Sequence, residues 1–236
     1  MAVRLETHRG TAAALHALPF PDDSRARIWH MLPAGPALVM GSGQSADLFD
    51  RAGLARAGVE LAPRRSGGGA VWIDPTSTVW IDVFAPRGSP LYAEDLTTTF
   101  VLVGRVWQRA FAASGVHLDL ARRAPTDPLA RWACWAGVGW GELFLPGHLG
   151  GTSRGGPVAK VLGLSQRRTR WGARVQGMAV VDGSAVQAAD WFADPGAPRA
   201  ATLRSRIGAN VDLVDVGLDR RQLSEAVIEH LRVAAG

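Results

Sequence analysis

Lysine is nearly absent from this chain of 236 residues: Lys160 is the only one, although the sequence carries 26 lysine and arginine side chains. No Gly-Lys dipeptide occurs, which excludes the phosphate-binding loop of P-loop nucleotidases. Cysteine also occurs once, at Cys134, so no internal disulfide can form. A single cysteine fits a reducing compartment, and we expect the protein to be cytoplasmic.

Long apolar runs and metal-binding patterns are missing as well. No stretch approaches the roughly 20 apolar residues that a membrane-spanning helix needs, and the opening MAVRLETHRG lacks the apolar core of a signal peptide. The six histidines are scattered, with no pair at ligand spacing, and no G-x-S-x-G elbow appears. We therefore expect no membrane partner and no metal site.

Positive charge is spread along the chain. The net charge is +5 and the isoelectric point is near 10.7, with arginine doublets at 64–65, 122–123, 167–168 and 220–221. A nucleic-acid binder would more often gather its charge in one stripe with aromatics between. We expect no nucleic-acid partner and favour an acidic protein partner for a chain that we expect to be a monomer.

The pattern of apolar residues predicts a single α+β domain over residues 1–236, with mixed or antiparallel sheets packed against helices and no accessory C-terminal domain. Helices are expected at 10–18, 91–114, 184–192 and 219–233. Residues 37–63 predict a strand, turn, helix and strand. Residues 64–86 predict a hairpin around the sequence PTST. Further strands are expected at 27–32, 116–120, 140–145, 158–164 and 172–181, with loops in the proline- and glycine-rich segment 124–157.

One glycine pattern imitates a dinucleotide-binding fingerprint. Gly41-x-Gly43-x-x-Ala46 follows a predicted strand, and Glu60 lies at about the right distance downstream. A doubly wound fold should continue with alternating strands and helices, whereas this chain continues into β-rich pieces. We interpret the pattern as a turn.

A second glycine motif is more informative. Three consecutive glycines at the start of a strand allow a ligand to approach the backbone closely, and their N–H groups can cradle an anion or a carbonyl oxygen. The motif comprises Arg64, Arg65, Ser66, Gly67, Gly68, Gly69 and Ala70, and Asp74 follows it.

A third motif surrounds the only lysine, in AKVLGLSQRR. Lysine is a compact point charge, whereas arginine presents a wide planar fork. In a chain with 26 basic residues and one lysine, position 160 therefore indicates a need for the compact cation. Such a cation beside a carbonyl group would stabilise a developing oxyanion.

The two motifs, in this order, resemble those of the lipoate–protein ligase A family, within the biotin/lipoate protein ligase catalytic-domain superfamily. Residues 25–235 follow the family layout. The resemblance implies a biotin/lipoate-ligase-like catalytic domain in which Lys160 contacts the acyl carbonyl and, in ligases, the phosphate of an acyl-adenylate. It assigns substrate binding to Arg64, Arg65, Ser66, Gly67, Gly68, Gly69, Ala70, Asp74, Gly163, Ser165, Gln166 and Gly177.

The segment ACWAGVGWGEL resembles the Ala-Cys-Phe…Glu-Leu stretch of the cysteine-type octanoyltransferases. That resemblance implies that Cys134 receives the acyl group from acyl carrier protein as a thioester. The acceptors would be lysines of lipoyl-domain proteins, including the glycine cleavage H-type protein. Octanoate or lipoate would be the transferred group, and we expect no tightly bound cofactor.

Two alternatives stay open. The first is an ATP-dependent lipoate–protein ligase acting through lipoyl-AMP, which would use ATP with magnesium and leave Cys134 as a small buried hydrophobic residue. The second is a non-catalytic acyl-binding relative. The sequence departs from the family at Ile73 and at Thr76-Ser77, where a His and a Gly-Asn pair are usual, and at Ala159.

Overall fold

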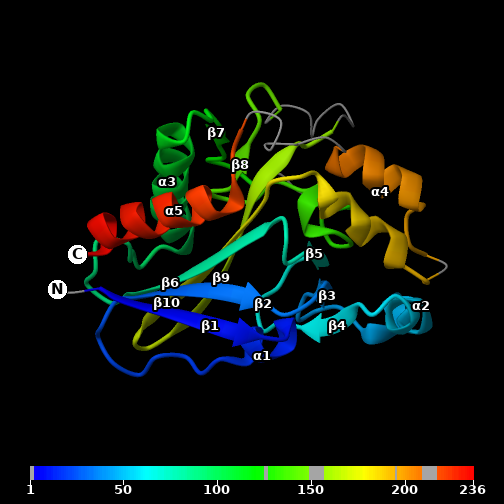
Figure 1. Cartoon of the computed structure of the whole chain (residues 1–236), viewed down its shortest axis with the longest axis horizontal. Coiled ribbons are helices and arrows are strands. Elements are labelled where there is room, and N and C mark those ends of the chain that lie inside the picture. The colour runs from blue at the N-terminus through cyan, green and yellow to red at the C-terminus, as the bar shows by residue number, and fades with distance from the viewer. Residues whose placement is uncertain (1–2, 125–126, 149–156, 195, 209–216) are drawn as a thin grey trace.

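The computed structural model describes residues 3–124, 127–148, 157–194, 196–208 and 217–236. The chain forms two sheets that lie side by side, with helices packed around them (Figure 1). This is the α+β arrangement that the sequence predicted. Residues 149–156 of the proline- and glycine-rich segment lie outside the described residues.

The larger sheet has seven strands in the order β1-β2-β6-β10-β9-β8-β7. Only β1 and β2 run parallel, and the remaining neighbours are antiparallel. Its strands are β1 (Arg4–Gly10), β2 (Arg27–Pro33), β6 (Thr78–Pro86), β7 (Asp119–Leu120), β8 (Leu143–Phe144), β9 (Lys160–Thr169) and β10 (Gly172–Val180).

The smaller sheet has three strands in the order β4-β3-β5, with β3 parallel to β4 and antiparallel to β5. The strands are β3 (Ala37–Met40), β4 (Glu60–Pro63) and β5 (Val71–Ile73). Between β3 and β4 lie a short 3₁₀ turn, η1 (Ala46–Leu48), and helix α2 (Arg51–Arg56), which matches the predicted order of strand, turn, helix and strand.

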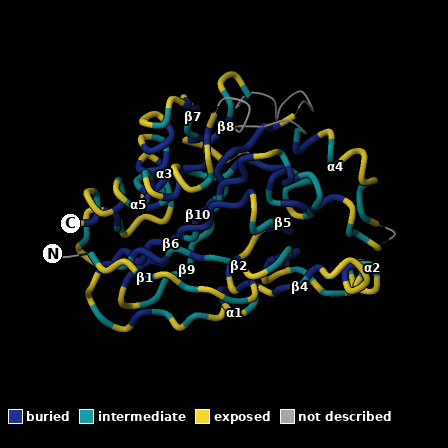
Figure 2. Tube along the Cα trace, viewed as in Figure 1, coloured by how far each residue is buried: buried dark blue, intermediate teal, exposed yellow. Residues whose placement is uncertain are grey.

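Two long helices cover one face of the larger sheet. They are α3 (Leu96–Ala113) and α5 (Arg220–Ala235), whose first turns are capped by the carboxylates of Asp95 and Asp219. Apolar side chains at helical spacing, Trp107 and Phe111 among them, join the core beneath. Figure 2 shows the buried trace along the sheet and the exposed outer turns of these helices.

Shorter elements pack on the opposite side, around a second core that includes Trp29, Trp80 and Trp135. They are α1 (Ala12–Ala17), η2 (Cys134–Ala136), η4 (Ser184–Trp191) and α4 (Ala200–Ile207). The expected helices at 10–18 and 184–192 are therefore present, the second as 3₁₀ helix. Among the described residues, no helix is both long and apolar enough to cross a membrane.

The predicted hairpin at 64–86 is wrong. Strand β5 pairs with β3 in the smaller sheet, while β6 lies between β2 and β10 in the larger one. The turn between them carries the chain from one sheet to the other, and Asp74 Oδ1 closes it by accepting from the Thr76 amide at 2.7 Å. Every residue of β6 is buried, so its pairing was decided by the core rather than by its neighbour in sequence.

The sequence reading also missed β1 and α4. Strand β1 is an edge strand that carries several charged residues and is little buried, so the sequence shows no apolar alternation there.

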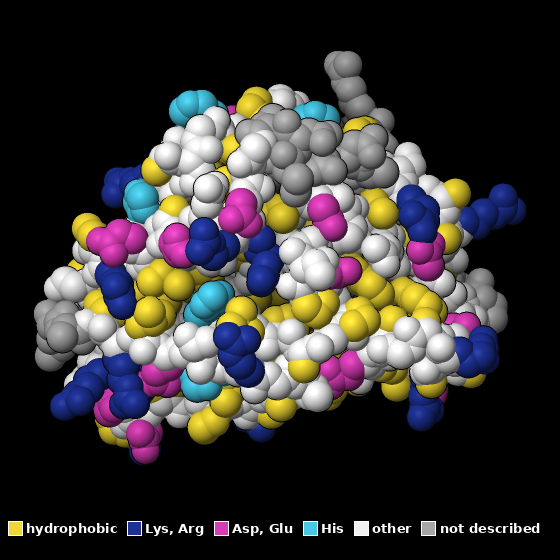
Figure 3. Space-filling model, in the orientation of Figure 1, with side chains coloured by type: hydrophobic (Ala, Val, Ile, Leu, Met, Phe, Trp, Pro, Cys, Tyr) yellow, Lys and Arg dark blue, Asp and Glu magenta, His cyan; other side chains and the backbone are white. Residues whose placement is uncertain are grey.

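Surface charge is mixed: on the face shown in Figure 3, basic and acidic side chains are interspersed and do not form one stripe. This distribution agrees with the scatter of arginines along the sequence.

Close packing of β10 against α3 predicts a large effect of one methyl group. A side chain at Gly177 would lie 2.8 Å from Nε1 of the fully buried Trp107. We expect Gly177→Ala to lower the free energy of unfolding by about 2 kcal/mol, because the indole cannot withdraw from the core. Gly43→Ala, whose methyl group meets nothing within 4 Å, is the matched control. Urea denaturation of both variants measures the difference, and equal stabilities would contradict the prediction.

Candidate active site

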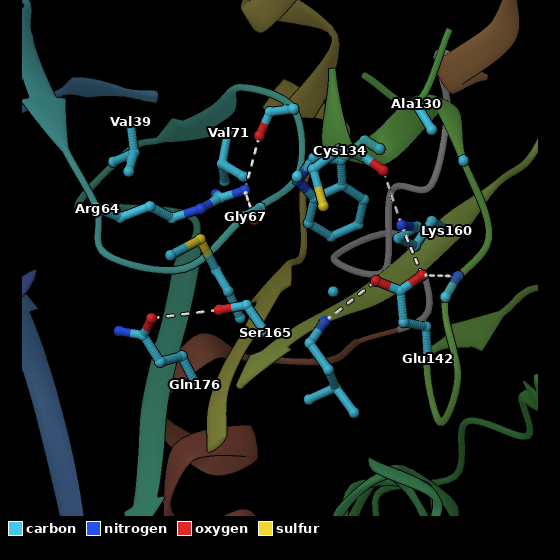
Figure 4. A pocket seen from close by; sticks show the side chains of 18 of the residues that line it. Val39, Arg64, Gly67, Val71, Ala130, Cys134, Glu142, Lys160, Ser165 and Gln176 are labelled. Carbon is cyan, nitrogen blue, oxygen red and sulfur yellow. Dashed lines mark hydrogen bonds and ion pairs between the residues drawn. The ribbon is translucent and has the colours of Figure 1, made fainter. Parts of the chain in front are cut away.

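A pocket of about 220 Å³ lies where the two sheets meet, between the glycine loop and the middle of β9 and β10. This is smaller than the roughly 300–1,000 Å³ of clefts that take drug-sized ligands. Figure 4 shows the residues around it. Much of its wall is apolar, comprising Val39, Val71, Trp80, Trp135, Leu164 and Met178. Such a wall suits a slender alkyl chain.

Lys160 is the first residue of β9 and is buried in this pocket. Its Nζ donates to the Cys134 carbonyl oxygen at 2.8 Å and forms an ion pair with Glu142 Oε2 at 2.7 Å. A lysine ammonium has three N–H donors, and these two contacts use two of them. Among the described residues none accepts the third, so it stays available to a substrate. The preceding Ala159 has φ of 46°, a left-handed conformation that is uncommon outside glycine, and it shapes the start of the strand.

Glu142 was not among the predicted site residues. Its carboxylate is buried, accepts hydrogen bonds from the Gly139 amide and, at 3.2 Å, from the Leu164 amide, and pairs with Lys160. Removing a carboxylate from water is costly unless it is paired and hydrogen-bonded. The Glu-Leu dipeptide after Cys134 was the available sequence signal, but it gives no hint that the carboxylate turns back onto the lysine.

Cys134 begins η2 and is half-buried, with its thiol in the pocket. The backbone around it pairs with the glycine loop: the Ala70 amide donates to the Trp132 carbonyl at 2.7 Å, and the Cys134 amide donates to the Ala70 carbonyl at 2.9 Å. A methyl group on Gly69 would lie 2.5 Å from the Ala130 carbonyl oxygen. Only glycine permits this approach, which joins the two motifs in space.

Arg64 lies on the other side of the thiol from Lys160 (Figure 4). Its NH2 nitrogen donates to the carbonyls of Gly67 at 2.9 Å and Gly69 at 2.8 Å, which holds the glycine loop in shape. Burial lowers the pKa of Arg64, while the nearby Cys134 and Glu142 act to raise it. Cys134 is therefore placed between two cationic side chains.

A hydrogen-bonded network closes the other end of the pocket. Gln176 accepts from the hydroxyls of Ser66 and Ser165 at 3.3 and 3.2 Å, and its Nε2 lies 3.2 Å from Nδ1 of His16 and 3.3 Å from Oδ2 of Asp82. His16 belongs to α1, which Glu60 holds in place by accepting from the Ala12 amide at 2.7 Å. Glu60 therefore anchors helix α1. In a dinucleotide-binding fold the acidic residue at this point of the pattern would bind the ribose instead.

The turn that imitates a dinucleotide fingerprint also has a structural task. The side chain of Gln44, just after Gly43, donates to the carbonyls of Arg131 and Trp132 at 3.0 and 3.1 Å. The Ser42 amide donates to the Ser66 carbonyl at 3.0 Å. The turn therefore holds both the glycine loop and the segment that leads to Cys134.

The structure brings most of the predicted site residues together and leaves others outside. Those that line the pocket are Arg64, Gly67, Gly68, Gly69, Cys134, Lys160, Gly163 and Ser165. Ser66 and Ala70 act one step away, through the hydrogen bonds described above. Those that do not line it are Arg65, which is exposed, Asp74 in its turn, Gln166 beside Arg168, and Gly177 against Trp107. No group of three metal-ligating side chains occurs among the described residues.

The match to a family model defines the class of this protein as an enzyme, either an acyltransferase or a ligase. Residues 14–232 match the lipoyl protein ligase A/B catalytic domain. The chain therefore belongs to this family, which places it among the ligases and transferases of protein lipoylation. A comparison with curated protein sequences gave no match.

Solved structures share the fold at low identity. The chain is similar to a bi-partite lipoate protein ligase from Thermoplasma acidophilum, with 16% identity, a TM-score of 0.68, and coverage of 99% of this chain and 84% of that one. It is also similar to a lipoate-protein ligase A bound with ATP, with 16% identity, a TM-score of 0.63 and coverage of 99% and 85%. A third similar structure is P. falciparum LipL1 in complex with lipoate, with 10% identity, a TM-score of 0.61 and coverage of 98% and 61%.

The buried pair of Lys160 and Glu142 predicts strong energetic coupling. Glu142→Gln leaves an ammonium group buried without its counter-charge, and we expect it to lower the free energy of unfolding by about 3 kcal/mol. Lys160→Met should cost a similar amount. The double variant should cost clearly less than the sum, because neither charge is then left alone. Urea denaturation of the four proteins tests this, and additive losses would refute a coupled pair.

The buried imidazole of His16 predicts sensitivity to acid. Burial, with Arg64 and Arg174 nearby, lowers its pKa from 6.5 to about 3. Between these values the unfolded chain holds the proton and the folded chain does not, so stability falls as the pH drops from 6.5 toward about 3. The slope should reach about 1.4 kcal/mol per pH unit.

The matched measurement compares the wild type with His16→Phe by urea denaturation between about pH 7 and pH 4. Because the variant lacks this titration, its disadvantage should shrink as the pH falls. A constant difference across the range would contradict the buried neutral histidine.

Proposed function

We propose that this protein carries an octanoyl or lipoyl group as a thioester on Cys134 and transfers it to a lysine of a lipoyl-domain protein. The observation that carries the proposal is the position of the thiol, which lies in the acyl-sized pocket between the cations of Arg64 and Lys160. The sulfur of a cysteine is a strong nucleophile, and this position lets it reach an acyl carbonyl that lies beside Lys160.

The first step exchanges one thioester for another. The Cys134 sulfur attacks the carbonyl carbon of an acyl carrier protein thioester, the carbon–sulfur bond to the carrier breaks, and the carrier thiol leaves with the proton that Cys134 gave up. The free N–H of Lys160 donates to the oxyanion that forms between these events. The exchange needs no ATP.

The second step forms the product amide. The amine of the acceptor lysine attacks the Cys134 thioester, the carbon–sulfur bond breaks, and the sulfur takes the proton that the amine loses. Lys160 again stabilises the oxyanion, while Glu142 fixes the direction of its ammonium group. Replacing a thioester by an amide is strongly downhill, which drives the transfer forward.

Both proposed protein partners, the carrier protein and lipoyl domains such as the H-type protein, are acidic as a rule, whereas this chain carries a net charge of +5. Complementary charge speeds the encounter of two proteins and orients them. The reducing environment that a free thiol nucleophile requires fits the cytoplasm.

An ATP-dependent lipoate ligase is the alternative that a specific observation favours, since a ligase of the same fold binds ATP. In that case Lys160 would contact the phosphate of lipoyl-AMP, and Cys134 would only fill space. Lys160 already pairs with Glu142, so the phosphate of lipoyl-AMP would have to bind the remaining N–H of this ammonium group beside a carboxylate.

The decisive experiment is the intact mass of the protein after mixing with octanoyl or lipoyl carrier protein, without ATP. We expect an acyl adduct that hydroxylamine removes, absent from Cys134→Ala. Lys160→Arg should form the adduct at least about tenfold more slowly, because its wider head group cannot keep both anchors and the oxyanion contact.

No adduct, or an adduct that survives in Cys134→Ala, would sink the thioester route. Release of pyrophosphate from ATP in the presence of lipoate would then identify the ligase. Acyl binding without either reaction would identify a non-catalytic relative.

A further inference from the structure

One polar atom in the pocket wall has no partner. His16 lines the pocket and is buried, and its Nε2 makes no hydrogen bond among the described residues. A buried donor or acceptor left unpaired is costly, because it has given up its hydrogen bond to water. A ligand that pairs with this nitrogen would recover that cost.

The surrounding network fixes the imidazole tautomer. Asp82 accepts from Trp80 Nε1 at 2.7 Å and from Arg174 Nε at 2.8 Å, so its carboxylate faces donors. Gln176 must therefore turn its NH₂ toward Asp82 and its oxygen toward the two serine hydroxyls. The same NH₂ donates to Nδ1 of His16, which makes Nδ1 an acceptor and places the ring proton on Nε2. The unpaired atom is a donor.

This donor lies at the far end of the pocket from the reacting groups. In Figure 4, Gln176 and Ser165 lie on one side and Lys160 and Glu142 on the other, with Cys134 between them. His16 contacts Gln176 and packs on the Trp80 ring, with centroids 4.5 Å apart. An acyl chain whose carbonyl lies at Lys160 therefore extends its tail toward His16.

We propose that His16 selects the transferred group, by donating its Nε2 hydrogen to a sulfur of a dithiolane-bearing lipoyl tail. An octanoyl tail offers no acceptor and would leave the donor unpaired. Two neighbours suit sulfur as well: Met178 is soft and polarisable, and the Trp80 ring favours sulfur at its edge. Because the pKa of His16 is lowered to about 3, the ring stays neutral at working pH and offers one fixed donor.

This inference rests on the proposed function for the position of the acyl carbonyl, and it narrows the substrate class. A preference for the dithiolane places the transfer after the reaction that adds sulfur to the acyl chain. The donor of the acyl group would then already carry a lipoyl rather than an octanoyl group.

The test measures binding of free lipoate and free octanoate by calorimetry, without carrier protein or ATP. The wild type should bind lipoate more tightly than octanoate, and His16→Phe should weaken lipoate binding about fivefold while leaving octanoate within about twofold. His30→Phe, on β2 and outside the pocket lining, is the matched control. Equal affinity of the wild type for both acids, or equal losses for both in His16→Phe, would overturn the proposal.

A second measurement needs no variant. In the ¹⁵N-histidine spectrum of the wild type, His16 should show the Nε2–H tautomer, and its proton should move downfield with lipoate but not with octanoate. An Nδ1–H tautomer, or the same response to both acids, would overturn the assignment. Neither measurement requires a thioester at Cys134, so failure of the transfer mechanism and failure of this inference are distinguishable.

Discussion

The buried ion pair between Lys160 and Glu142 is the constraint on which the site depends. Removing either charge from water is costly, and the opposite charge 2.7 Å away offsets that cost for both groups. The pair joins the start of β9 to the segment before β8, and the second bond of Lys160 reaches the Cys134 carbonyl. One lysine thus fixes the relative positions of the three segments that the proposed chemistry needs.

The glycine loop supplies the other half of the frame. Its backbone forms hydrogen bonds with the Cys134 segment at Ala70. Because Gly69 has no side chain, the two segments can pack backbone against backbone. Arg64 donates to the Gly67 and Gly69 carbonyls within the same loop. These hydrogen bonds hold a glycine-rich segment in one conformation, in which it forms a wall of the pocket. The loop leads into the smaller sheet and Lys160 begins a strand of the larger one, so residues from both sheets line the pocket.

The sequence predicted the α+β class and most of the strands and helices, because apolar periods and caps are local signals. It could not predict that β5 and β6 separate into two sheets, since that choice depends on buried partners far away in the chain. Cys134 and Lys160 were found through their rarity and their motifs. Glu142 and His16 were missed because an ordinary acid and a helical histidine acquire their roles only through contacts far away in the chain, with Lys160 and Leu164 for Glu142 and with Gln176 for His16.

Arg64 and Lys160 make different sets of contacts, and each set suits the head group that makes it. At position 64 the task is to bind several carbonyl oxygens of one loop, and the planar fork with its five donors does this. At position 160 the ammonium binds a carbonyl oxygen and a carboxylate, and the proposed reaction asks it to donate to an oxyanion as well, which suits a compact charge with three diverging donors. The only lysine of the sequence therefore stands where the proposed reaction calls for a compact head group.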